Sequence, residues 1–288
     1  RLRAAGAVLV GRTNMTEFAF SGLGLNPHYG TPLCGWDRAQ ARIAGGSSSG
    51  AAASVAEGMA YAALGTDTGG SLRIPAAFCG LGAYPLSPSI DAVGPIARSV
   101  DCCARMDGVL ADEPPVAVAM PVRGVRLAVP VGVMTADLDA EVAAGFDRAL
   151  ARLSAAGALI TPVRSAAIEA AARSGVQGIV ACAEAWALHR RLLAARGDEY
   201  DPRVARRVRA GSDIAAVDYA EAVRHRSALG AGWAEEAARF DAYVAPTVAC
   251  VPPRLAPLEQ SALEDYAADL RVLRNTSIVN ALDGCALS

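Results

Sequence analysis

The sequence predicts a single α/β domain. Short apolar segments alternate with longer segments whose apolar residues recur at helical spacing. Over residues 125–163 the order is strand, helix, strand, which implies a βαβ crossover and a parallel pair of strands. Neither an internal repeat nor a low-complexity linker divides the 288 residues, and a chain of this length can bury a large core.

The N-terminal third is expected to hold short elements. A helix end stops at Gly6, and a short buried strand follows over residues 7–10. Asn14 and Glu17 form a variant of the capping box, so a short helix is expected to begin at Met15. The remaining expectations are a loop over 21–32, a helix over 50–58, a strand over 61–67, a turn-rich stretch over 75–95, a helix over 96–110 and a surface break over 112–115.

The rest of the chain carries longer elements. Residues 125–130 and 158–163 are expected strands, and the helix between them has apolar residues every four positions and ends at Gly157. The remaining expected elements are a helix over 166–196 broken around Gly175 and Gly178, helices over 200–209, 218–239 and 263–282, and a strand over 241–247.

The composition excludes several classes of protein. A net charge of −2 gives no electrostatic reason to expect a nucleic acid or an anionic membrane as a partner. A membrane span needs roughly 18 apolar residues in a row, and the most apolar stretch, residues 51–64, is interrupted by Glu57. The seven cysteines show neither CxxC pairs nor a Cys/His metal spacing. We therefore expect buried thiols in a reducing compartment, the cytoplasm, and no metal site.

Two glycine-flanked serine turns carry the chemistry, at residues 45–50 and 65–73. Glycine frees the backbone and leaves N–H groups that suit an anion or a developing oxyanion. Ser71, at the carboxyl end of the central strand, is therefore a candidate nucleophile for acyl transfer. The alternative is a phosphate-binding or purely structural turn, although the Lys of a P-loop and the G-x-S-x-G elbow are both absent. Asp67 and Arg73 flank Ser71, and as a buried ion pair they would fix the loop.

A serine nucleophile also needs a proton acceptor. Ser47 is a candidate relay, with a helix N-cap at the serine run as the alternative, but three consecutive serines exceed what one cap needs. His189 and His225 lie in arginine-rich helical segments as surface groups, and only His28, in a loop, is a candidate for a cleft. A Ser-His-Asp arrangement therefore has little support.

These motifs together resemble the amidase signature family. Both serine turns stand at the family's distance, and the segments at residues 11–18, 93–99 and 245–247 also look like family segments. The resemblance covers nearly the whole chain, and the double serine motif is highly specific. It implies a large mixed β-sheet core covered by helices on both faces. It also implies amide hydrolysis through a Ser–Ser–Lys triad that uses no metal and no organic cofactor.

Carried over residue by residue, the resemblance gives each motif residue a role. Ser71 would be the nucleophile that forms the acyl ester, and Ser47, held after a cis peptide, would be the bridging serine. The other implied site residues are Thr68, Gly69 and Gly70 for the oxyanion hole, Ser48, Asp67 and Arg73 as supports of the site, and Met15 at the border of the substrate pocket.

The chain departs from the family pattern in three places. All 27 basic residues are arginine, which stays protonated and cannot replace the lysine as a base. The family's Lys-Pro-Thr segment is missing after Gly80, and family members extend beyond the equivalent of Ser288. We therefore expect one amidase signature domain over residues 1–288 that lacks its N-terminal part, an internal loop near residues 81–82 and its C-terminal tail. As it stands, we expect this polypeptide to be inactive.

The first functional hypothesis is an amidohydrolase that cleaves the C–N bond of a small-molecule carboxylic amide through a serine acyl-enzyme intermediate, with a homodimer as a candidate assembly. One alternative is the glutaminase subunit of a tRNA-dependent amidotransferase, which would need a partner subunit. The other is a catalytically inactive amidase fold that serves as a binding or scaffold protein. The sequence does not indicate which amide is the substrate.

Overall fold

The computed structural model describes residues 1–83, 91–114 and 120–288. The expected turn-rich stretch over 75–95 and the surface break over 112–115 therefore lie partly outside the described residues. The α-helices are α1 (Ser49–Ala56), α2 (Arg73–Cys79), α3 (Val100–Ala111), α4 (Ala140–Ala155), α5 (Ala166–Ser174), α6 (Val176–Arg196), α7 (Pro202–Ala210), α8 (Ala216–Ala237), α9 (Leu255–Gln260) and α10 (Ala262–Ala281). The strands are β1 (Ala62–Asp67), β2 (Gly82–Ala83), β3 (Ala92–Ala97), β4 (Arg126–Pro130), β5 (Leu159–Val163) and β6 (Ala242–Tyr243). Short 3-10 helices are η1 (Glu17–Ala19), η2 (Arg38–Gln40), η3 (Gly197–Glu199) and η4 (Gly211–Asp213).

The α/β class is confirmed, and the described strands pair in two sheets. One sheet has the order β1-β3-β2 and is antiparallel, with Gly65 opposite Gly94. The other has the order β5-β4-β6 and is parallel, so the predicted βαβ unit over residues 125–163 is confirmed, with α4 as its crossover. The sheet implied by the family resemblance is thus present as two sheets of three strands in the part of the chain described.

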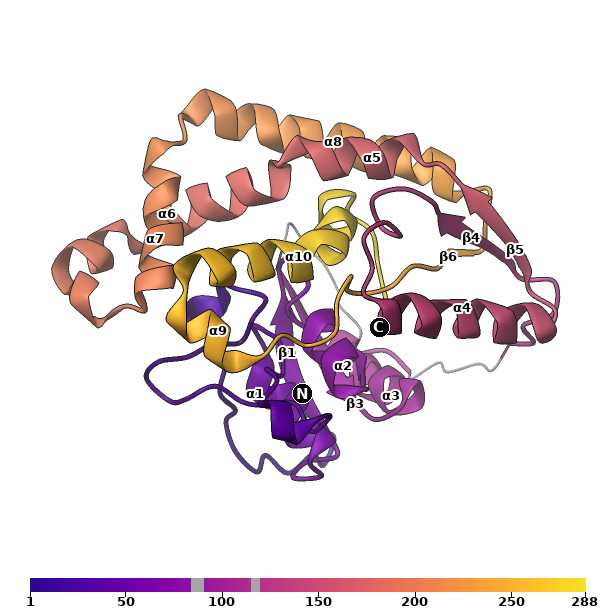
Figure 1. Ribbon diagram of the computed structural model, residues 1–288, viewed down its shortest axis with the longest axis horizontal. Coiled ribbons are helices and arrows are strands. Elements are labelled where there is room, and N and C mark those ends of the chain that lie inside the picture. Colours follow the sequence, from indigo (N-terminus) through magenta and orange to yellow (C-terminus); the bar gives the residue numbers. More distant parts are fainter. Residues whose placement is uncertain (84–90, 115–119) are drawn as a thin grey trace.

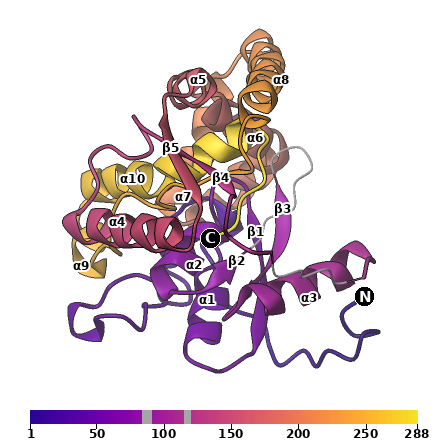
Figure 2. The same cartoon turned by 90° about the vertical axis from the view of Figure 1, so that its right-hand side faces the viewer.

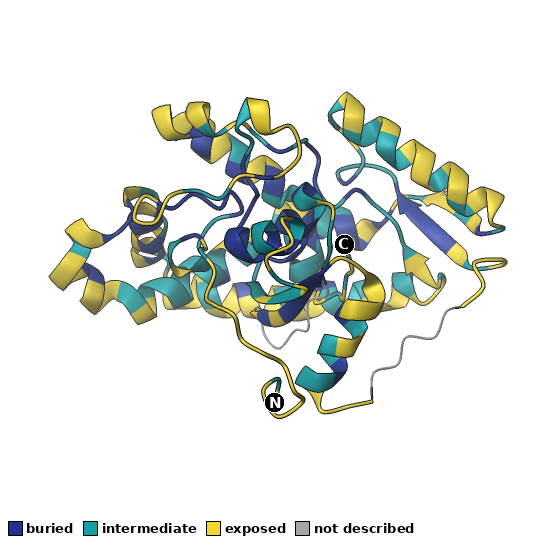
Figure 3. Ribbon diagram, turned by 90° about the horizontal axis from the view of Figure 1, so that it is seen from below, coloured by how far each residue is buried: buried dark blue, intermediate teal, exposed yellow. Residues whose placement is uncertain are grey.

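Helix α10 runs through the middle of the molecule (Figure 1). It contacts α2 on one side and α5, α6 and α8 on the other. Val272 belongs to the core cluster that contains Leu23 and Ile74, whereas Ile278 belongs to the cluster under α5 and α8. Viewed from the side, α3 lies on the flank that carries the N-terminus and α4 lies on the opposite flank (Figure 2). Buried residues gather around the centre, and the outer sides of the peripheral helices are exposed (Figure 3).

Several expected boundaries differ from the structure near the N-terminus. The strand predicted over residues 7–10 is absent, and Val8 and Val10 are 83% and 76% exposed. An apolar run forms a strand only where a partner satisfies its backbone groups, and no described residue pairs with this segment. The helix predicted to begin at Met15 is only the single 3-10 turn η1.

Two further predictions were wrong in the elements after the second serine turn. The helix predicted from residue 96 begins at Val100, where the Ser99 side chain accepts the Cys102 N–H, and the preceding residues pair with β1 as strand β3. The strand predicted over 241–247 is limited to β6. Its ladder ends after Val244 N donates to Ala128 O at 2.8 Å, since Pro246 has no N–H to donate.

Candidate active site

The two serine turns lie against each other at the end of β1. Ser48 N donates to Ser71 O at 3.2 Å, and the Ser48 side chain contacts both the N–H and the carbonyl of Thr66 at 3.3 Å. A Cβ at Gly65 would collide with the Ser48 hydroxyl, so the close approach of α1 and β1 requires glycine there. The serine run begins α1, but the Ser48 side chain makes no capping hydrogen bond.

One carboxylate shapes the turn that carries Ser71. Asp67 accepts hydrogen bonds from the N–H groups of Gly70 at 2.8 Å and Leu72 at 3.2 Å. Arg73 donates to both Asp67 oxygens, at 3.0 Å each. Burial alone raises the pKa of Asp67, but the Arg73 charge and these hydrogen bonds outweigh it and hold the pKa below 3.8. Asp67 and Arg73 are therefore a charged pair inside the protein.

Helix α10 supports the same turn from the far side. Thr276 Oγ1 donates to Gly69 O at 2.6 Å and Ser277 Oγ donates to it at 3.3 Å. Asn280 Nδ2 donates to Asp67 Oδ1 at 3.2 Å, and Arg73 Nη2 donates to Asn280 Oδ1. Sequence analysis missed these residues. Polar side chains one turn apart, on a helix face that is otherwise buried and apolar, are the signal that could have indicated them.

The glycines of the turn have different environments. Gly70 has a φ of +131°, and a Cβ on it would collide with Thr276 Oγ1, so no other residue fits. Its N–H points inward to Asp67. The N–H groups of Gly69 and Ser71, in contrast, have no acceptor among the described residues. Thr68 donates its hydroxyl to Asp91 and accepts a hydrogen bond from the Gln177 amide at its carbonyl.

Ser47, in the first serine turn, has no access to solvent. The Gly46–Ser47 peptide bond is cis. The Ser47 carbonyl accepts hydrogen bonds from Thr16 N at 3.1 Å and Ser49 N at 2.8 Å. The Ser47 hydroxyl has no partner among the described residues, so it is not hydrogen-bonded to Ser71. An unsatisfied buried hydroxyl is costly, and this one is free to bond a further group.

Ser71 lines a cavity of about 500 Å³ together with Thr68 and Gly69. Its walls are mainly apolar residues of α5, α6 and α10, such as Val176, Leu273 and Ile278. The polar side chains in these walls include Gln177, Arg207, Asp269 and Arg274. Ser71 is only 4% exposed, so an acyl group would reach it through this cavity.

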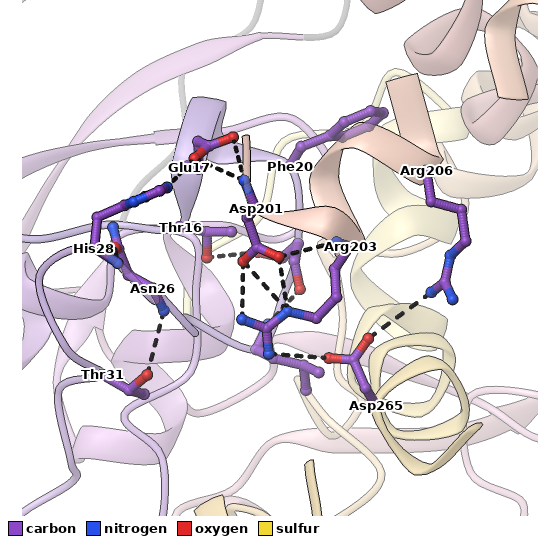
Figure 4. Close-up of polar contacts among 12 residues, drawn as sticks. Thr16, Glu17, Phe20, Asn26, His28, Thr31, Asp201, Arg203, Arg206 and Asp265 are labelled. Atoms are coloured by element: carbon purple, nitrogen blue, oxygen red, sulfur yellow. Dashed lines mark hydrogen bonds and ion pairs between the residues drawn. The ribbon is translucent and has the colours of Figure 1, made fainter. Parts of the chain in front are cut away.

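Met15 lies elsewhere, in a second cavity of about 780 Å³ that also contains His28, Glu17 and Tyr200. His28 Nε2 lies 2.7 Å from Glu17 Oε2, and both oxygens of Glu17 accept the Asp201 N–H at 3.1 Å (Figure 4). None of the three histidines lines the Ser71 cavity.

An ionic cluster joins α7 to the N-terminal loop and α10 (Figure 4). Arg203 Nη2 forms an ion pair with Asp201 Oδ2 at 2.8 Å, and Arg203 Nη1 lies 4.0 Å from Asp265 Oδ1. Asp269 accepts hydrogen bonds from Gly22 N at 2.9 Å and from Arg207 at 2.8 Å. The cluster therefore fixes one wall of the Ser71 cavity.

The chain matches a known protein family over its whole length. The Amidase family model covers residues 1–288. The chain belongs to the amidase family. It is 35% identical over 305 residues to 2-amino-5-chloromuconic acid deaminase of Comamonas testosteroni, covering 100% of this chain and 66% of that protein. It is 33% identical over 296 residues to a glutamyl-tRNA(Gln) amidotransferase subunit of Symbiobacterium thermophilum, covering 86% of this chain and 60% of that protein. The chain thus spans less than two thirds of the length of these curated relatives.

Solved structures of the amidase family have the same fold. A crystal structure of an amidase matches 99% of this chain and 68% of its own with a TM-score of 0.88 and 30% identity. The corresponding glutamyl-tRNA(Gln) amidotransferase subunit of Thermotoga maritima matches 100% of this chain and 67% of its own with a TM-score of 0.78 and 26% identity. Within the described ranges, no helix is both long and apolar enough to cross a bilayer, and no three His, Cys, Asp or Glu side chains gather as metal ligands.

Proposed function

We propose that the complete protein is an amidohydrolase in which Ser71 is the nucleophile. Ser71 Oγ attacks the amide carbonyl carbon, the C–N bond breaks, and an acyl ester remains on the serine until water releases the acid. The observation that carries this proposal is the placement of Ser71 in an apolar cavity beside two N–H groups without acceptors among the described residues, those of Gly69 and Ser71 itself. These groups, together with Thr68, are the proposed donors to the oxyanion.

In this proposal Ser47 carries the proton. Its hydroxyl is buried and has no hydrogen-bond partner in the part of the chain described. Ser47 belongs to the serine turn that contacts the turn of Ser71 through the hydrogen bond from Ser48 N to Ser71 O. It would take the proton from Ser71 and pass it to a base, which later returns it to the leaving amine. The 288 residues contain no lysine. We propose that the base is a lysine of a segment outside them, and that residues 1–288 form part of one amidase signature domain.

The decisive experiment replaces Ser71 by Ala in the complete protein. We expect the kcat for amide hydrolysis to fall to background, while Ser54→Ala, a change on α1 outside the site, keeps wild-type turnover. Among the described residues, the Ser54 hydroxyl makes one hydrogen bond, which it donates to the Ala51 carbonyl at 2.9 Å. Undiminished turnover by Ser71→Ala would reject the assignment.

A second candidate is the glutaminase subunit of an amidotransferase, because curated relatives and a solved structure have the name of such a subunit. This candidate requires a partner subunit, whereas the amidase is expected to act as a homodimer. Sedimentation of the purified complete protein, with an assay for amide hydrolysis, separates the two. Turnover by a lone homodimer favours the amidase.

We also propose a cytoplasmic location. The cysteines of the described residues are unpaired, and Cys34, Cys103 and Cys250 are buried, which suits a reducing compartment. Cell fractionation with an antibody to the protein tests it.

A further inference from the structure

Three charged side chains line the Ser71 cavity, and their charges do not sum to zero. They are Arg207, Asp269 and Arg274. Arg207 donates to Asp269 at 2.8 Å and to Phe20 O at 3.0 Å, and Asp269 also accepts from Gly22 and Ser21. These two charges neutralise each other. The positive charge of Arg274 is left over, so the described lining of the cavity carries one net positive charge.

Arg274 has little to bind within the protein. Its Nε donates to Asn275 Oδ1 at 3.0 Å, and this is the one hydrogen bond that its side chain donates within the described residues. Its Nη2 is shielded from solvent and has no acceptor there, and the side chain forms no ion pair in that part of the chain. Burial lowers the pKa of the guanidinium, and the charge of Arg271 acts in the same direction, whereas Asp137 opposes the shift. Arg274 nevertheless lines the cavity, and a planar guanidinium without an ion-pair partner suits a carboxylate bound there.

Arg274 lies about one helical turn from a residue of α10 that contacts the turn carrying Ser71. Ser277, which contacts Gly69 O in the turn of Ser71, lies three residues further along α10, about one helical turn away. Ser71 and Arg274 both line the cavity, and most of its other lining residues are apolar. A substrate with an amide at Ser71, a short hydrocarbon chain and an anion at Arg274 would match this distribution.

We propose that Arg274 binds a carboxylate on the acyl part of the substrate, so that the protein prefers monoamides of short dicarboxylic acids over neutral amides. The inference rests on the proposed amidohydrolase function. The carboxylate on the acyl part stays bound to Arg274 through both formation and hydrolysis of the ester on Ser71. Gln177 lines the same cavity, and its side-chain amide donates a hydrogen bond to the carbonyl of Thr68.

The test measures kcat/KM of the complete protein on succinamate, glutaramate and adipamate and on the matched neutral amides butyramide, valeramide and hexanamide. We expect Arg274→Gln to lower kcat/KM for the charged amides by about 10- to 100-fold, the effect of one charge-assisted contact. The values for the neutral amides should change by less than about threefold. Arg274→Lys should restore part of the preference because it keeps the charge.

Arg271→Gln is the matched control. It removes a positive charge from the same helix, where Arg271 pairs with Asp139 at 2.7 Å outside the cavity. It should leave the preference intact. A wild-type protein that hydrolyses charged and neutral amides equally well, or an equal loss on both in Arg274→Gln, overturns the inference but leaves the amidohydrolase standing.

Binding distinguishes failure of the inference from failure of the proposed function. If the wild-type protein hydrolyses no amide, calorimetry with succinate, glutarate and adipate tests the site without turnover. Binding that is lost in Arg274→Gln and kept in Arg271→Gln supports the carboxylate site on its own. Absence of binding to all three dicarboxylates rejects it.

Discussion

At the residue scale, Asp67 shapes the turn that carries Ser71 in the candidate site. Its two oxygens bind the backbone of the turn and the Arg73 guanidinium at once. The turn around Ser71 is therefore shaped by charge-assisted hydrogen bonds. The neighbouring positions of Asp67 and Arg73 made this pair predictable from sequence. The contact of Arg73 with Asn280, more than 200 residues away, was not.

Asp67→Asn is expected to destabilise the protein strongly, because it leaves the buried Arg73 without its counter-charge. Loss of one member of a buried pair costs about 3–5 kcal/mol of unfolding free energy. Urea denaturation of the complete protein measures it. Asp241→Asn is the control, since the Asp241–Arg126 pair is about half exposed, and we expect a far smaller change. Equal effects of the two substitutions would show that Asp67 is not a stabilising charge.

The same carboxylate predicts a pH dependence of stability. The pKa of Asp67 in the folded protein lies below 3.8, so the folded state binds fewer protons at this group than the unfolded state. Its stabilising contribution is present above about pH 4 and is lost as the pH falls through the lowered pKa. Unfolding free energies between about pH 5 and pH 3 should fall more steeply for the wild type than for Asp67→Asn. Parallel curves would contradict this assignment.

At the scale of elements, α10 both forms the centre of the core and supports the site. Val272 and Ile278 pack into different core clusters, and Thr276, between them, binds Gly69 O. The helix itself was predictable from its spacing of apolar residues. Its role was not, since a helical pattern shows which face is buried but not which distant turn that face meets.

Thr276→Val keeps the shape of the side chain and removes its hydroxyl. Thr276 Oγ1 is 2.6 Å from Gly69 O, so we expect a loss of about 1 kcal/mol of unfolding free energy. We expect a larger loss of kcat, about tenfold or more, because the N–H groups of the turn shift. Thr161→Val, on the exposed side of β5, is the control and should change neither quantity. A fall in stability without any fall in kcat would mean that α10 does not position the turn.

The other helices and strands show which sequence signals were sufficient to predict an element. The break between α5 and α6 falls at Gly175, with a φ of +61°, as predicted from the glycine itself. The parallel pair β4 and β5 followed from element order. The strand predicted from the apolar run at residues 7–10 was wrong, because strand formation depends on a partner strand that the local sequence does not specify.

At the scale of the whole molecule, the candidate site is assembled from distant parts of the chain. Ser71 is near the start, Gln177 is in α6 and Arg274 is in α10, yet all three line one cavity. The serine motif indicated the proposed reacting groups, Ser47 and Ser71, because they are close in sequence. The cavity wall could not be predicted, since it depends on how α6 and α10 pack beside the turn that carries Ser71.

The last prediction concerns the proton path and the 288 residues as a unit. The Ser47 hydroxyl has no partner in the described structure, and the chain offers arginine but no lysine. Arginine does not accept a proton near neutral pH. We therefore expect residues 1–288, expressed alone and shown by circular dichroism to be folded, to have no amidase activity, whereas the complete protein is active. In the complete protein Ser47→Ala should lower kcat severely, because Ser71 then loses the route for its proton. Full turnover by the isolated 288 residues would show that Ser71 is activated by a group already present within them.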